Sequence, residues 1–304
     1  MNTNVEERKV PIASMETVTT STLFSRQAKV VVRRIIQNRL ALVGFILVLF
    51  VTCVALFAPI LAPHDPLEMK VENRLQAPST SYWFGTDEFG RDLLSRVIYG
   101  SQTSMIVGFT VVMITSVCGL VMGLYSAYYR RLDNVLMRIN DGLMAFPAIL
   151  LAIAIMAALG PRLENVIIAL SIVYTPTVAR TIRSAAIVVR ELSYIEAIRA
   201  LGGKSWRIIW LHMAPNCLSP LIVQASFIFA YAVIIEASLS FLGAGTPPPS
   251  PSWGNIISDG KILLRQAWWM TAFPGIAIMI TVLGLNLLGD GLRDLLDPHT
   301  SKAK

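Results

Sequence analysis

The sequence predicts an all-α, polytopic membrane protein with six transmembrane helices and both termini in the cytoplasm. Three observations lead to this fold class. Of the 304 residues, 54% are hydrophobic and only 15% are charged, whereas soluble domains carry about 25% charged residues. The hydrophobic residues fall in long runs, and the Lys and Arg residues gather between these runs. This distribution disfavours a soluble enzyme. It also disfavours nucleic-acid binding, which needs a basic face with exposed aromatic side chains.

The hydrophobic runs predict a tail and six spans in order along the chain. Residues 1–39 are polar and basic and are expected to form a cytoplasmic tail. Residues 40–62 are uncharged and exceed the roughly 20 residues that cross the hydrocarbon core as a helix. The other spans are predicted at residues 101–129, 143–160, 163–179, 217–242 and 268–288; the fourth is the weakest, because it is short and contains Pro176. One transmembrane domain over residues 40–298 follows from this pattern, with a cytoplasmic tail over 299–304.

The distribution of Lys and Arg predicts the orientation of these spans. An even number of spans places both termini on one side of the membrane. If that side is the cytoplasm, 19 of the 26 Lys and Arg residues lie in cytoplasmic segments and 7 lie outside. Cytoplasmic segments normally carry the excess of these cations. The predicted topology therefore has external loops at 63–100 and 243–267 and a long cytoplasmic loop at 180–216.

The long cytoplasmic loop contains a Gly-Gly-Lys-Ser string at residues 202–205, which we compare with a phosphate-binding loop and with a turn between two helices. Residues 202–205 are similar to the end of a phosphate-binding loop, but Ile198 stands where that motif requires glycine. ATP binding by this chain is therefore not expected. The segment instead predicts a short helix, a turn at Gly202, and a second short helix that carries Trp206 and is closed by Pro215. Such a hairpin could lie on the membrane surface with its Trp side chains as anchors, or it could be the docking surface for a partner.

Two polar residues lie inside predicted spans and are candidates for a gate or a translocation path. Apart from Glu164 at the very start of the fourth span, Glu236 is the only formal charge within a predicted span, and an ionised side chain there costs roughly 2.5 to 3.5 kcal/mol on insertion scales. It is either a path or gate residue, or a structural carboxylate hydrogen-bonded across a subunit interface near the outer end of its helix. Asn286 lies in the sixth span. These two residues are too few for an intramembrane enzyme, so no catalytic residue is expected.

The first external loop carries a compact group of charges. Asp87, Arg91, Asp92 and Arg96 place two charges of each sign within ten positions. They predict either a loop held by its own ion pairs, or an outer gate or receptor-docking surface. The three His residues, by contrast, are far apart in sequence and lack the spacing of metal ligands, so no metal site is expected.

Several motifs together resemble one family of membrane proteins. The Glu196–Ala197 pair, Gly202 six residues after the glutamate and Pro215 thirteen residues after that glycine resemble the cytoplasmic loop of permease subunits of ATP-binding-cassette (ABC) importers. The strings at residues 85–92, 236–243 and 286–294 resemble the second, or C-type, permease of the dipeptide and oligopeptide branch, which also includes nickel importers. The resemblance covers roughly residues 30–298.

This resemblance implies a fold, a location and a set of partners. The fold would be that of a type I ABC-importer permease in the bacterial cytoplasmic (inner) membrane, surrounded by membrane lipids. The partners would be a homologous second permease, two ATPase subunits that bind the ATP and Mg²⁺, and an external substrate-binding protein. Glu196, Ala197, Gly202 and Pro215 would dock an ATPase, and this chain would hold no cofactor of its own.

The cargo implied by the resemblance is a dipeptide or oligopeptide. Glutathione, a nickel chelate or another small solute remain alternatives, because the external receptor does most of the selecting in this family. A self-sufficient secondary transporter is a rival from another class. It would usually show broken helices or inverted repeats, and no internal repeat is visible in the sequence.

Overall fold

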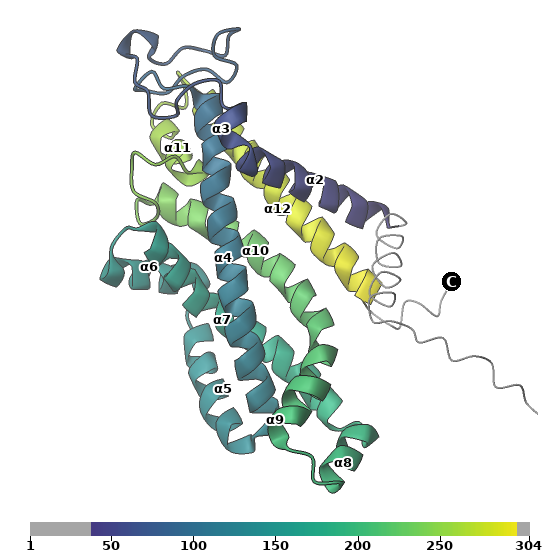
Figure 1. Cartoon of the computed structure of the whole chain (residues 1–304). Helices are drawn as coiled ribbons and strands as arrows, with labels where there is room; N and C mark the ends of the chain where they lie inside the picture. Colours follow the sequence, from purple (N-terminus) through teal and green to yellow (C-terminus); the bar gives the residue numbers. More distant parts are fainter. Residues whose placement is uncertain (1–37, 297–304) are drawn as a thin grey trace, which may run out of the picture.

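The computed structural model describes residues 38–296, so the predicted tails over 1–37 and 299–304 lie outside the described residues. Figure 1 shows an elongated helical bundle without a sheet in the part of the chain that is described. Apart from one isolated bridge between Thr86 and Asp92, its regular structure is helical. The predicted all-α, membrane-spanning class is confirmed.

Five helical segments are long and apolar enough to cross a membrane. They are α2 (Arg39–Leu56), α4 (Leu93–Tyr128), α7 (Leu163–Arg190), a continuous helical run from Ser205 to Phe241 that ends in α10 (Leu218–Phe241), and α12 (Trp269–Leu296). Each overlaps most of one predicted span. Short helices α3 (Ala58–Leu61), η1 (Val71–Asn73) and α11 (Trp253–Gly260) lie in the connections between them.

The predicted third span is broken in the structure. α5 (Arg130–Met144) and α6 (Ala148–Leu159) form an angle of 92° and make a sixth span only if the bent pair is counted as one. α6 alone has 12 residues and is about 18 Å long, which is less than the hydrocarbon thickness. The break lies at Pro147, which has an extended backbone and precedes α6, because the proline ring cannot continue the helix of α5.

Two spans are longer than predicted because their polar ends are packed. α7 continues past Pro176 to Arg190, and Ile182, Ala186 and Val189 are buried along one face of this extension. α4 begins at Leu93, eight residues before the predicted start, with the Asp92 side chain accepting from Ser95 N as its N-cap. The long cytoplasmic loop predicted at 180–216 is therefore mostly helical.

The second half of that loop differs from the prediction in its hydrogen bonding. The run from Ser205 starts as α-helix in α9 (Ser205–Arg207), continues as π-helix over η2 (Ile208–Met213) and as 3₁₀-helix over η3 (Ala214–Cys217), and then enters α10. Pro215 does not close a separate helix. It lies in the first turn of the 3₁₀ segment, where the missing N–H of proline is tolerated.

Close helix packing joins α2 to α12, which lie side by side in Figure 1. A Cβ on Gly44 would overlap the backbone nitrogen of Leu288, and one on Gly284 would lie 2.8 Å from Leu47 Cβ. A Cβ on Gly291 would overlap Ala41. We call Gly44, Gly284 and Gly291 the glycine seam. Small residues of this kind let helix backbones approach closely in membranes.

Candidate coupling and gating sites

The predicted cytoplasmic loop presents a short helix, α8 (Ser193–Ala200), with one buried side and one exposed side. Ile195 is fully buried and Ile198 packs against the main core. Glu196 and Ala197 are exposed, and Leu201, directly after the helix, is 88% exposed. α8 is thus fixed to the bundle by two isoleucines and leaves a mixed apolar and acidic surface uncovered at the end of the molecule (Figure 1).

Two glycines end α8 in a specific turn. Gly202 has a φ of +79°, and its N–H bonds to Arg199 O at 3.0 Å while the N–H of Gly203 bonds to Ile198 O at 3.0 Å. This is the Schellman arrangement, which favours glycine at the left-handed position. The predicted turn at Gly202 is therefore present. The sequence analysis did not assign a role to Gly203, on which a Cβ would lie 2.6 Å from Ile198 Cγ2.

Side-chain contacts connect the α8 turn to the two long helices beside it. Tyr128, the last residue of α4, donates its hydroxyl hydrogen to Ser205 Oγ at 3.2 Å, and the Arg199 guanidinium lies 5.5 Å from the centre of the Tyr128 ring. On the other side, Asn216 Nδ2 lies 3.3 Å from the Tyr194 hydroxyl oxygen and donates to His212 O at 2.7 Å. Pro215, next to Asn216, is exposed. α8 and its turn are therefore in contact with the end of α4 and with η3, directly before α10.

The four candidate charged residues of the predicted first external loop are buried. Asp87, Arg91, Asp92 and Arg96 are each at most 4% exposed. Asp87 Oδ2 lies 2.5 Å from Arg91 Nε and 3.5 Å from Arg96 Nε, and the N–H groups of Phe89 and Arg91 donate to its other oxygen. This burial favours a structural role for these residues, and their role as a gate or receptor contact stays a prediction.

A second carboxylate that the sequence analysis missed completes this cluster. Asp259, in α11, lies 3.8 Å from Arg91 Nη2 and 3.9 Å from Arg96 Nη2. Burial raises the pKa of Asp259 above its ordinary value, while Arg96 and Arg91 oppose the shift. We call Asp87, Arg91, Arg96 and Asp259 the external charge cluster. It joins the first external loop to α4 and α11, and no local sequence pattern pairs Asp259 with arginines so far away along the chain.

Asp92 has a separate set of contacts at the start of α4. Its Oδ2 accepts from Ser95 N at 2.9 Å and from Ser95 Oγ at 2.6 Å. His64 Nδ1 lies 3.6 Å from the same oxygen. Asp92 therefore caps α4 and also faces the beginning of the external loop.

Glu236 is completely buried in α10 and has partners within this chain. Ser104 Oγ, in α4, donates to Oε2 at 3.0 Å, and Ser240 Oγ donates to Oε1 at 2.8 Å. Ser240 Oγ in turn accepts from Thr246 N at 3.1 Å. The partners predicted across a subunit interface are thus found inside the chain instead, because the α4 and α10 backbones bring residues 132 positions apart together.

Asn286 lies apart from this site. It is half-buried in α12, while Glu236 contacts α4 and the loop after α10. The structure therefore does not bring the two candidate path residues together. The external charge cluster, the Glu236 site and the α8 turn are three separate places, and α4 contributes to each of them through Arg96, Ser104 and Tyr128.

Comparison with known proteins identifies the family to which this chain belongs. A family model described as the inner membrane component of binding-protein-dependent transport systems matches residues 115–302, and one described as the N-terminal transmembrane domain of oligopeptide transport permease C matches residues 26–78.

Curated relatives match over most of their length. A putative peptide transport system permease protein of Brucella abortus is 51% identical over 88% of this chain and 90% of its own. A dipeptide transport system permease protein of Alkalihalophilus pseudofirmus is 47% identical over 86% of each chain. A glutathione transport system permease protein of Pectobacterium atrosepticum is 39% identical over 88% of this chain and 89% of its own. The chain therefore belongs to the family of inner membrane components of binding-protein-dependent transport systems, and it is a multi-pass protein of the inner membrane.

Proposed function

We propose that this chain is one of two homologous permease subunits of an ABC importer that moves peptides across the cytoplasmic membrane. Its other partners are two cytoplasmic ATPase subunits and an external binding protein that delivers the peptide. The observation that carries this proposal is the connection of an exposed cytoplasmic helix, α8, to α4 and α10 through Tyr128 and Asn216. A surface with this geometry suits a partner that binds α8 and moves the ends of α4 and α10 through it.

The mechanism is alternating access driven from the α8 surface. Ala197 and Leu201 supply an apolar contact and Glu196 a charge for the ATPase. When the ATPases close on ATP, α8 moves and displaces the attached ends of α4 and α10. α4 has 36 residues and is about 54 Å long, so a tilt at its cytoplasmic end reaches the Glu236 site and the external charge cluster. Rigid-body tilting of packed helices is a common way to open a path on one side and close it on the other.

This chain performs no chemistry on its substrate in the proposed mechanism. ATP and Mg²⁺ are held by the ATPase subunits, and the Gly-Gly-Lys-Ser string at 202–205 serves another purpose here. Gly202 and Gly203 end α8, and Lys204 and Ser205 lead into the next helix. A loop that wraps phosphates would instead need glycine at position 198, where Ile198 packs against the core.

Peptides are the proposed cargo because two relatives that are 51% and 47% identical are named as peptide and dipeptide permeases. Glutathione is the second candidate, supported by the relative that is 39% identical. Uptake of a radiolabelled dipeptide and of radiolabelled glutathione by the complete importer in proteoliposomes separates the two. Competition by the unlabelled compound should be strongest for the true cargo.

The coupling role is tested with Gly202→Val. A β-branched residue at a φ of +79° is strained by about 1 to 3 kcal/mol, which distorts the end of α8. We expect the assembled complex to lose peptide-stimulated ATP hydrolysis while insertion and assembly continue. Gly142→Ala, in α5, is the matched control, because a Cβ there meets nothing within 4 Å. Normal stimulated hydrolysis in an intact Gly202→Val complex would contradict ATPase docking and favour the interfacial-anchor interpretation.

A further inference from the structure

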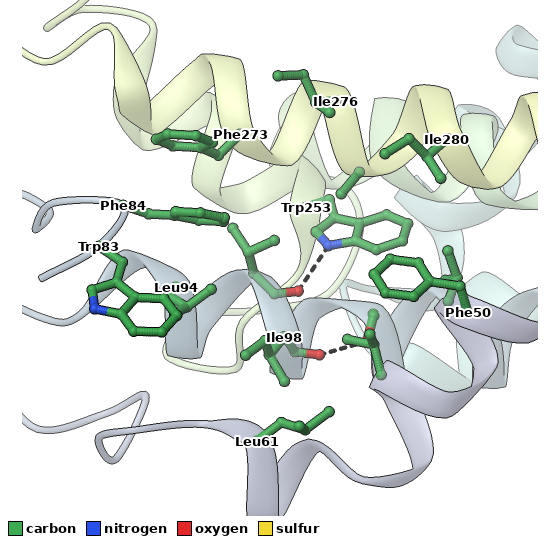
Figure 2. A pocket seen from close by; sticks show the side chains of 15 residues that line it. Phe50, Leu61, Trp83, Phe84, Leu94, Ile98, Trp253, Phe273, Ile276 and Ile280 are labelled. Carbon is green, nitrogen blue, oxygen red and sulfur yellow. Dashed lines mark hydrogen bonds between the residues drawn. The ribbon is translucent and has the colours of Figure 1, made fainter. Parts of the chain in front are cut away.

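An apolar groove of about 510 Å³ lies where α2 runs into α3 and where α4 and α12 begin. Figure 2 shows the side chains around it, which include Phe50 of α2, Ile98 of α4, Ile276 of α12 and Trp83 of the predicted first external loop. Phe50 is 58% exposed and Ile276 is 45% exposed, so the groove opens to the outside of the chain. Its walls come mostly from three membrane-spanning helices.

The polar atoms deep in the groove already have partners. Trp253 Nε1 donates to Val97 O at 3.0 Å, and Ser101 Oγ donates to Ile98 O at 2.5 Å, the two dashed lines in Figure 2. The deep part of the groove is therefore apolar towards a ligand and suits hydrocarbon. Trp83 is 71% exposed and lies in the external loop, at the end of the groove where an indole would meet lipid headgroups.

The geometry points to a binding site for one acyl chain of a membrane phospholipid. Most of the groove's walls belong to α2, α4 and α12, which are long and apolar enough to cross a membrane, so the hydrocarbon of the bilayer surrounds the opening. A flexible, narrow acyl chain can enter between the aromatic side chains directly from that hydrocarbon. In the predicted orientation, the lipid belongs to the outer leaflet.

The chain's own tails are not the proposed occupant. Asn38 Nδ2 lies 3.4 Å from Asp294 Oδ2, so both ends of the described chain lie together at the opposite end of α2 and α12 (Figure 1). Residues 1–37 also carry six Lys or Arg residues, which would be costly to place in an apolar site. An acyl chain from the bilayer has neither restriction.

The bound chain would fill the space between the external loop and the helices. Phe84 of the loop stacks on Phe273 of α12, with ring centres 3.9 Å apart, and both rings line the groove. This is a direct loop-to-helix contact next to the proposed lipid. An acyl chain in the groove extends the same apolar contact to α2 and α4 and excludes water from it.

Photolabelling tests this site. The complete importer is placed in nanodiscs of phosphatidylethanolamine and phosphatidylglycerol that contain phosphatidylethanolamine with a diazirine on one acyl chain. After irradiation, the labelled residues are mapped by mass spectrometry. We expect labelling of Ile98, which is only 8% exposed, to equal or exceed labelling of Met279, which is 60% exposed on the outside of α12. Ala277→Phe should fill the groove and remove most of the labelling at Ile98.

The control is Met279→Phe, which adds a ring on the same helix outside the groove and should leave the labelling at Ile98 unchanged. Val54→Phe fills the groove from α2 and replaces Ala277→Phe if that variant fails to assemble. Labelling that follows exposed area alone, with Ile98 unlabelled, would overturn the proposal. So would a photo-crosslinker at Ile276 that captures the partner permease, because a protein segment would then occupy the groove.

Discussion

The hydroxyl of Tyr128 and the hydroxyl of Ser205 are 3.2 Å apart and join the end of α4 to the start of the helical run that becomes α10. The two residues lie 77 positions apart on either side of α8. This bond therefore joins two long helices directly beside the proposed ATPase surface.

Loss of this bond should affect coupling more than folding. In Tyr128→Phe, one hydrogen bond with a net value of about 0.5 to 1.5 kcal/mol is removed, while the aromatic ring under Arg199 is kept. We expect an assembled importer that moves fewer peptides for each ATP hydrolysed, measured as the ratio of uptake to phosphate release in proteoliposomes. Tyr125→Phe, one turn earlier in α4, is the control. An unchanged ratio would show that α8 acts through other contacts.

Substitutions at Glu236 should separate charge from hydrogen bonding. Glu236→Leu leaves the buried hydroxyls of Ser104 and Ser240 without their acceptor, at about 1 to 3 kcal/mol for each. We expect a lower melting temperature of the complex, whereas Glu236→Gln should retain both stability and transport. Ser238→Ala is the control, since Ser238 is half-buried on the same helix and its hydroxyl donates to Ile234 O and not to Glu236. Lost transport in a stable Gln variant would instead make Glu236 a path or gate residue.

The external charge cluster should contribute strongly to stability. Arg91→Gln removes the closest partner of the buried Asp87 carboxylate, and breaking a buried ion pair in this way costs about 3 to 5 kcal/mol. We expect a clear fall in melting temperature with unchanged salt dependence of receptor binding. Lys70→Gln, which removes the exposed ion pair with Glu68, should leave the melting temperature unaltered. A salt-dependent loss of receptor affinity in Arg91→Gln would assign the cluster to receptor docking.

The raised pKa of Asp259 predicts a pH dependence with a definite sign. Burial makes the folded chain bind the proton of Asp259 more tightly than the unfolded chain does, so stability from this group declines as the pH rises. The decline begins at a pH near the ordinary Asp pKa of 3.8 and is complete above the raised pKa of Asp259 in the folded chain. As the pH rises through this interval, the melting temperature of the parent should therefore fall relative to that of Asp259→Asn. A shift in favour of the parent would mean that Arg91 and Arg96 outweigh burial.

The orientation rests on the distribution of cations and can be measured directly. Reporter fusions after residues 80, 138, 205, 258 and 300 should report outside, inside, inside, outside and inside. The residue 138 fusion is the most informative, because it lies in α5, the first half of the broken third span. A cytoplasmic signal after residue 80 would refute the predicted topology.

The sequence was sufficient to locate the spans, because hydrophobic runs are a local signal. It was insufficient to locate the residues at which the helices begin and end. Residues 93–100 and 180–190 contain charged side chains, and they are helical because Arg96 is paired in the external charge cluster and Ile182 is packed against the bundle. Such stabilisation depends on residues far away along the chain.

The same limit applies to the candidate sites. The turn at Gly202 could be predicted because a glycine pair after a helical segment is a local pattern. The partner of Glu236 on α4 and the contribution of Asp259 to the arginines could not, since both depend on how α4 packs against α10 and α11. Burial of the external charges has the same origin.

The glycine seam between α2 and α12 has a consequence for genetic screens. Gly44 and Gly284 touch no charge cluster and no docking surface, yet any side chain there collides with the facing helix. A screen for mutants defective in uptake will therefore recover these positions as readily as true path residues. A map of the substrate route that uses loss of growth alone would therefore wrongly include residues of α2 and α12. Only mutants whose protein level in the membrane is normal should be placed on such a map.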